Sequence, residues 1–168
     1  MTTSTAQQGE DAPRGQPEQR AILGAARAAA ARGDLRAAIS RFEEYLRLNP
    51  KDHKVRREYA GVLVRAKEMK QAIEQYQQLR KALPDSSEIH LDLANVYLQI
   101  RQARKAIPHL LIAQKNSPED LVIATRLAQA YVGDGDPRKA RSSLSSSCRA
   151  CARATPRCLP PLAACSST

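Results

Sequence analysis

The chain has 168 residues, of which 42% are hydrophobic and only 4% aromatic, and it carries a formal charge of +10. A chain of this length can bury one core, and the scarcity of aromatic side chains argues against a sandwich or barrel. Abundant Ala and Leu favour helices that pack closely through small side chains, and no apolar run is long enough to span a bilayer.

Residues 1–18 are polar and contain Pro13, Gly15 and Pro17, so we predict a disordered N-terminal lead. This segment lacks the basic and then apolar layout of a secretory signal. We therefore expect a cytoplasmic location, with a periplasmic location as the alternative if the native start lies upstream.

Two residue types then recur with a period of 34 residues: proline at Pro50, Pro84 and Pro118, and alanine at Ala38, Ala72, Ala106 and Ala140. A turn-like pair precedes each alanine, at Gly33-Asp34, Lys67-Glu68, Arg101-Gln102 and Gly135-Asp136. Such a period predicts a repeat protein in which each unit is a pair of helices. The recurring alanine has a physical reason, since two helices of a hairpin approach closely only where one side chain is small.

The segment 87–120 illustrates one unit. Leu93 and Tyr97 lie on an apolar stripe of a first helix, and Leu110 lies on the stripe of a second helix. We expect Pro108 in the first turn of this second helix, where the missing backbone N–H has no intrahelical partner to lose.

These features resemble the tetratricopeptide repeat. The matching residues are the small residue of the first helix (Ala26, Ala60, Ala94, Ala128), the tyrosine three residues later (Tyr97, Tyr131), the recurring alanine and proline, and the aromatic residue four beyond the alanine (Phe42, Tyr76). The resemblance implies an all-α solenoid of antiparallel helix pairs over residues 19–144. Its units are 19–52, 53–86, 87–120 and a partial fourth, 121–144.

The segment 145–168 is a basic tail rich in Ser and Cys, which we predict to be disordered. It contains all four cysteines, Cys148, Cys151, Cys158 and Cys165. Three interpretations stay open: a zinc or disulfide cluster, a natural tail, and a product of a shifted reading frame or truncation. The abrupt loss of the repeat pattern after Leu144 favours the third. The incomplete last unit predicts self-association through an uncapped C-terminal end.

The resemblance also implies that the first helices line a concave groove, where a peptide or helix of a partner protein binds. The predicted groove residues are Arg27, Arg57, Glu58, Arg65, Asp92, Asn95, Arg126 and Gln129, and the neighbouring positions Arg20 and Leu23 fall on the same face. A clamp for a C-terminal carboxylate, known from one sub-family, is excluded because Asp92 falls where a cation is needed.

The sequence therefore predicts a protein-interaction scaffold, active in the assembly of a larger complex, with no enzymatic activity, cofactor or metal. His53, His90 and His109 are expected to lie apart, so no nucleophile, base and orienting group converge. One alternative is a basic helical-repeat protein that binds nucleic acid, although the first 136 residues carry only +4 of the net charge. Another alternative is a fragment of a larger enzyme or secretion protein.

Overall fold

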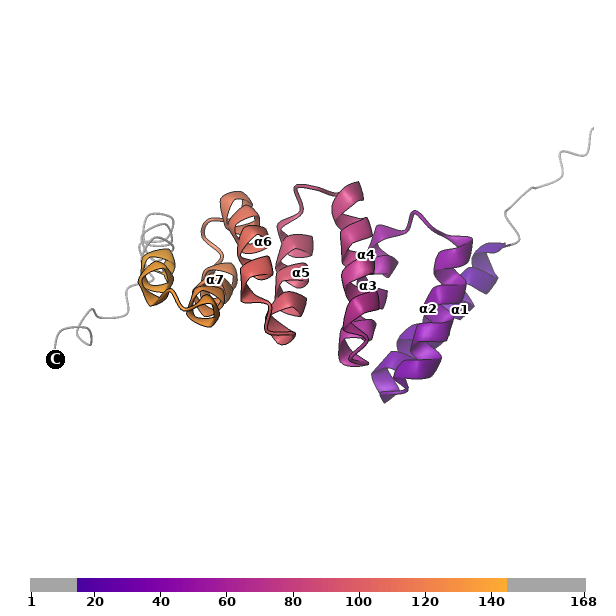
Figure 1. Cartoon of the computed structure of the whole chain (residues 1–168). Helices are drawn as coiled ribbons and strands as arrows, with labels where there is room; N and C mark the ends of the chain where they lie inside the picture. Colours follow the sequence, from indigo (N-terminus) through magenta and orange to yellow (C-terminus); the bar gives the residue numbers. More distant parts are fainter. Residues whose placement is uncertain (1–14, 145–168) are drawn as a thin grey trace, which may run out of the picture. The chain divides into compact units, whose positions relative to one another are not determined.

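A computed structural model describes residues 15–144 of the chain (Figure 1). Every regular element within these residues is a helix, which confirms the predicted all-α class. The helices are α1 (Gly15–Arg32), α2 (Leu35–Leu48), α3 (His53–Arg65), α4 (Met69–Ala82), α5 (Ser87–Gln99), α6 (Ala103–Asn116) and α7 (Leu121–Asp134). A further helical stretch covers residues 137–144.

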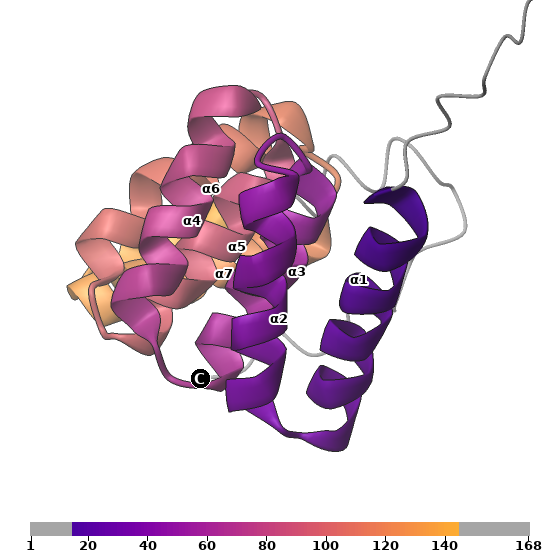
Figure 2. The same cartoon turned by 90° about the vertical axis from the view of Figure 1, so that its right-hand side faces the viewer.

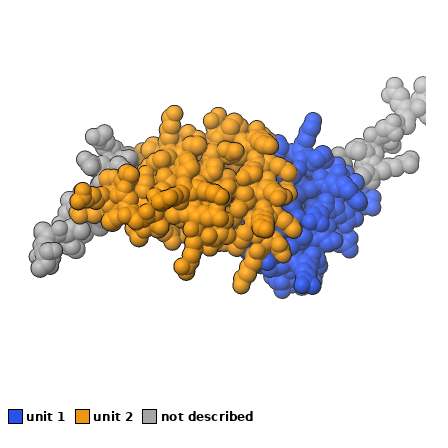
Figure 3. Space-filling view, in the orientation of Figure 1, with its two compact units in different colours: residues 1–66 blue, residues 67–168 orange. Residues whose placement is uncertain are grey.

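The helices fall into two compact units, coloured separately in Figure 3. The first unit, residues 1–66, contains α1, α2 and α3, and the second, residues 67–168, contains α4 to α7 and the stretch at 137–144. The boundary between the units lies in the turn between α3 and α4.

The helix starts follow the predicted period. Helices α3, α5 and α7 begin at His53, Ser87 and Leu121, which are the first residues of the predicted second, third and fourth repeats. The structure differs from the prediction at residues 15–18, which belong to α1 and not to a disordered lead. Proline is tolerated in the first helical turn, and Glu18 there interacts favourably with the helix dipole.

The turn after each first helix contains one residue with positive φ. These residues are Gly33 (82°), Lys67 (64°), Arg101 (58°) and Gly135 (87°), again with a period of 34. In the first, third and fourth of these turns the next residue donates its backbone N–H to a carbonyl five residues back: Asp34 to Ala29 at 3.0 Å, Gln102 to Tyr97 at 2.9 Å and Asp136 to Tyr131 at 2.9 Å. This pattern is the Schellman motif, which satisfies carbonyls that the helix end leaves unpaired.

The first unit buries one side of each of its helices. Figure 2 shows α1 and α2 side by side as an antiparallel hairpin. In α2 the buried stripe is Ala38, Phe42 and Leu46, with exposed fractions of 0%, 1% and 8%, at the helical spacing i, i+4, i+8. Helix α3 contributes Tyr59 and Leu63, and the rings of Phe42 and Tyr59 lie with centroids 6.2 Å apart.

The second unit repeats this arrangement with α5, α6 and α7. Ala106 and Leu110 of α6 are fully buried, and Leu93 of α5 and Leu127 of α7 are each only 1% exposed. The expectation for Pro108 was wrong, because α6 begins at Ala103 and the proline lies in its second turn. The turn at Arg101 starts the helix earlier than the sequence suggested, so a backbone hydrogen bond is lost at Pro108.

The predicted partial fourth repeat has a second helix within the described residues. The stretch at 137–144 buries Ala140 and Ser143 to exposed fractions of 6% and 8%. Asp136 accepts a hydrogen bond from the Lys139 backbone N–H at 3.2 Å and so caps its start. The predicted tail at 145–168, with all four cysteines, lies outside the described residues.

Candidate functional site

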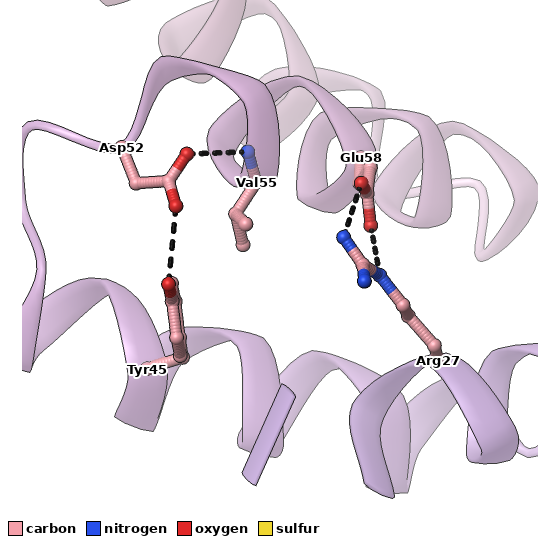
Figure 4. Close-up of polar contacts among 5 residues, drawn as sticks. All are labelled: Arg27, Tyr45, Asp52, Val55 and Glu58. Carbon is pink, nitrogen blue, oxygen red and sulfur yellow. Dashed lines mark hydrogen bonds and ion pairs between the residues drawn. The ribbon is translucent and has the colours of Figure 1, made fainter. Parts of the chain in front are cut away.

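The clearest polar feature of the first unit is an ion pair that joins α1 to α3 (Figure 4). Arg27 donates two hydrogen bonds to the Glu58 carboxylate, from Nε at 2.8 Å and from Nη2 at 2.7 Å. The hydrogen bond to Glu58 raises the pKa of Arg27, against the opposing effect of burial. Both side chains are partly exposed, at 54% and 41%, so the pair contributes at most about 1 kcal/mol to stability. The ion pair therefore mainly holds the two side chains in a fixed orientation and adds little to the stability of the fold.

A second contact holds the end of α2 against the start of α3. Tyr45 donates its hydroxyl to Asp52 Oδ2 at 3.1 Å, and the other Asp52 oxygen accepts the Val55 backbone N–H at 3.1 Å (Figure 4). Asp52 therefore caps α3 and orients the Tyr45 ring at the same time. Burial, together with the Asp52 hydrogen bond, raises the pKa of Tyr45 and keeps its hydroxyl protonated.

Beside these two contacts lies a shallow hollow. It is lined by Gln19, Arg20 and Leu23 of α1 and by Tyr45 of α2. Its volume of about 270 Å³ is below the range typical of small-molecule sites, so it fits side chains better than a cofactor. Arg20 is exposed, and within residues 15–144 it makes no hydrogen bond or ion pair.

Two more predicted groove residues lie on α3. Arg65 donates from Nη2 to the Ala30 carbonyl of α1 at 3.0 Å, so it ties the ends of two helices together. Arg57 is half-buried and already engaged in an interaction. Of the predicted groove residues, Arg27 and Glu58 thus contact each other directly, whereas Arg65 contacts the backbone of α1.

The other four predicted groove residues lie in the second unit. Asp92 and Asn95 are on α5, and Arg126 and Gln129 are on α7. Arg126 donates to Gln129 at 3.1 Å within its own helix, and Asn95 Oδ1 is buried with no hydrogen-bond partner among the described residues. A single groove that passes through the residues of both units stays a prediction.

The expectation that the histidines lie apart was wrong for two of them. His90 Nδ1 and His109 Nδ1 are 3.2 Å apart, and His90 Nε2 lies 2.9 Å from the Pro84 carbonyl. Because a carbonyl only accepts, His90 Nε2 donates to it, and for neutral rings His109 then donates to His90 Nδ1. Burial, followed by the effects of His90 and Arg80, lowers the pKa of His109 to about 4.

This histidine pair has a structural role. The ring of His109 stacks on Tyr97 with centroids 5.8 Å apart, and His90 is only 2% exposed. Neither ring faces a nucleophile in the contacts of the described residues. No group of three or more His, Cys, Asp or Glu side chains in residues 15–144 could hold a metal ion.

Gln19, Tyr45 and Asp52 were not among the predicted site residues. Asp52 was detectable, since an aspartate immediately before a first helix is a standard N-cap signal. Tyr45 was not, because it lies on the second helix α2, and neither its bond to Asp52 nor its place beside α1 residues in the hollow follows from the repeat pattern. None of the helices in the described residues has the length and apolarity of a membrane span.

Helices that begin with a period of 34 residues, with a positive-φ turn after each first helix, define an α-helical repeat protein of the solenoid class. Two family models, both described as tetratricopeptide repeat, match residues 29–90 and 70–120. Together they cover 29–120, which is more than half of the 168 residues. The chain belongs to the tetratricopeptide-repeat family.

Solved structures of the same fold include MamA proteins. One, "MamA 41-end from Desulfovibrio magneticus RS-1", has a TM-score of 0.73 and 21% identity over 83% of this chain and 78% of that chain. Another, "Crystal structure of MamA", has a TM-score of 0.72 and 16% identity over 81% and 80%. No curated protein matches the chain significantly. At these identities the likeness concerns the fold.

Proposed function

We propose that the chain is a protein-interaction scaffold whose first-helix faces bind an extended peptide or a helix of a partner protein and help to assemble a larger complex. The observation that carries this proposal is the hollow beside α1, whose Tyr45 wall is held in place by a hydrogen bond before any ligand arrives. Pre-ordered walls reduce the entropy lost on binding. Arrays of this family typically offer extended surfaces that bind other proteins.

Site-specific photocrosslinking tests this proposal in the full chain. A crosslinking residue placed at Leu23, in the hollow, should attach to a discrete partner in native cell extract. The matched control is a crosslinker at Leu48, a leucine that is 49% exposed in the same unit and outside the hollow. Equal crosslinking from both positions, or none from Leu23, contradicts binding at this face.

We propose in addition that copies of the chain associate through the apolar surface of the second unit. Leu111 and Val132 are 44% and 63% exposed. Leu111 also lines a hollow with Leu127, Tyr131 and residues of the stretch at 137–144. Apolar side chains around a hollow are typical of surfaces that bind protein.

A further inference from the structure

The first helices of the two units carry opposite net charge. Helices α1 and α3 together contain seven Arg and Lys residues and only two acidic ones, Glu18 and Glu58. Helices α5 and α7 together contain one basic residue, Arg126, and three acidic ones. An anionic ligand is therefore attracted to the first unit and repelled by the corresponding helices of the second.

The acidic residues from Asp34 onward in the first unit are already used by the protein itself. All five from residue 34 to residue 58 accept a hydrogen bond from a group of the same unit: Asp34 from the Ala37 N–H, Glu43 from Tyr59, Glu44 from Arg41, Asp52 from Tyr45, and Glu58 from Arg27. By contrast, Arg20 and Lys54 are exposed and make no hydrogen bond or ion pair within residues 15–144. The uncompensated charge of this unit is positive.

The hollow places one of these cations next to apolar surface. Arg20 lines it together with Leu23 and the Tyr45 ring. Arg27 lies one helical turn after Leu23 on α1, but Glu58 occupies its guanidinium with two hydrogen bonds. A ligand carboxylate can bind Arg20 directly, whereas it must displace Glu58 to bind Arg27.

We propose that the first unit selects an acidic segment of the partner, in which carboxylates alternate with aliphatic side chains. This inference rests on the proposed function and names the chemistry of its ligand. Arg20 binds a carboxylate, the Leu23–Tyr45 hollow receives an aliphatic side chain, and Glu58 limits affinity because it competes for Arg27. The positive charge also attracts nucleic acid, but the side chain-sized volume of the hollow and the presence of Leu23 in its lining favour a peptide.

The test is a fluorescence anisotropy titration of the full chain with defined, labelled peptides. The first peptide alternates Glu or Asp with Leu and Ser, the second replaces each acid by Gln or Asn, and the third replaces it by Lys. We expect only the acidic peptide to bind tightly, and Arg20→Gln to weaken it about fivefold to tenfold because one charge-assisted hydrogen bond is lost. Glu58→Gln should tighten binding several-fold, because it leaves Arg27 available.

Two variants separate recognition from folding. The exchange Arg27→Glu with Glu58→Arg keeps an ion pair and the net charge, so it serves as a folding control. Its melting temperature in thermal unfolding should equal that of the wild type. Arg126→Gln removes a cation from the corresponding helix face of the second unit, where we expect less than about a twofold change in affinity. An equal loss from Arg126→Gln and Arg20→Gln would mean that only net charge is sensed, which overturns the proposal.

The remaining outcomes are also distinct. If the neutral or the Lys peptide binds as tightly as the acidic one, selection for acid is wrong while peptide binding stands. If no peptide binds and no partner is crosslinked at Leu23, the proposed function fails as well. If a single-stranded oligonucleotide of equal charge binds as tightly as the acidic peptide and loses affinity equally with Arg20→Gln, the site is a general anion surface and the peptide proposal is wrong.

Discussion

The positive-φ position in each turn is filled by different residues along the chain. The first and fourth turns use Gly33-Asp34 and Gly135-Asp136, in which glycine adopts positive φ without strain and Asp34 and Asp136 cap the next helix. The third turn has Arg101 at φ 58°, and Gln102 makes no side-chain cap hydrogen bond. A side chain at positive φ costs about 1 kcal/mol, so this turn is weaker than the first and fourth.

We predict that Arg101→Gly combined with Gln102→Asp stabilises the protein by about 1–2 kcal/mol, through removal of the positive-φ strain and gain of an N-cap. Urea unfolding followed by circular dichroism measures the difference. The control is Gly33→Ala, which imposes on the first turn the strain that Arg101 imposes on the third and should destabilise by about 1 kcal/mol. An unchanged or lower stability of the double variant would show that the Arg101 and Gln102 side chains make compensating contacts.

His109 makes stability depend on pH. Its pKa is lowered from 6.5 to about 4 in the folded protein, first by burial and then by the neighbouring His90 and Arg80. Between these two values the unfolded chain binds more protons than the folded one, so the free energy of unfolding falls as pH decreases. The contribution of neutral His109 to the free energy of unfolding is therefore complete above pH 6.5. It is lost as pH falls from 6.5 toward 4.

We expect this effect to be about 1–2 kcal/mol by pH 4, after allowance for the partial exposure of the ring. Carboxylates also begin to titrate at the low end of this window, so the informative quantity is the difference between wild type and His109→Asn. The Asn side chain N–H can replace the donor of His109 Nδ1 but does not titrate. If both proteins lose stability identically between pH 7 and 4, His109 is not the titrating group.

At the scale of helices, the recurring alanine sets how closely a hairpin packs. Ala38 is fully buried, while Ala37 beside it on α2 is exposed. We predict that Ala38→Leu destabilises the protein by about 1–3 kcal/mol, because the added side chain overpacks the core. Ala37→Leu is the matched control and should change stability by less than about 0.5 kcal/mol. Equal effects of the two substitutions on the urea midpoint would contradict close packing at the repeat alanine.

The predictable and unpredictable parts of the fold differ in their physical origin. The starts of α3, α5 and α7 followed from the period of proline and alanine, because backbone restriction by proline and the small size of alanine act locally. The His90–His109 and Tyr45–Asp52 contacts did not follow, because they depend on how two helices are rotated against each other. Pro108 misled the prediction, since the hairpin contacts of α6 outweigh one lost backbone hydrogen bond. For the candidate site, the composition of the first helices predicted a polar face. It did not predict that Glu58 pairs with Arg27.

At the scale of the whole molecule, the apolar surface of the second unit bears on assembly. Leu111 is 44% exposed beside a hollow, and Leu48 of the first unit is similarly exposed at 49% but lines none of the hollows described above. If copies associate through the second unit, Leu111→Ser removes apolar area from the interface, whereas Leu48→Ser removes a similar area from unrelated surface.

Sedimentation velocity over a concentration series should show the wild type and Leu48→Ser associating equally. Leu111→Ser should stay monomeric to concentrations about tenfold higher, as expected from the loss of about 1.4 kcal/mol of apolar burial. A monomeric wild type, or an equal loss of association in both variants, would remove the second unit as the self-association surface.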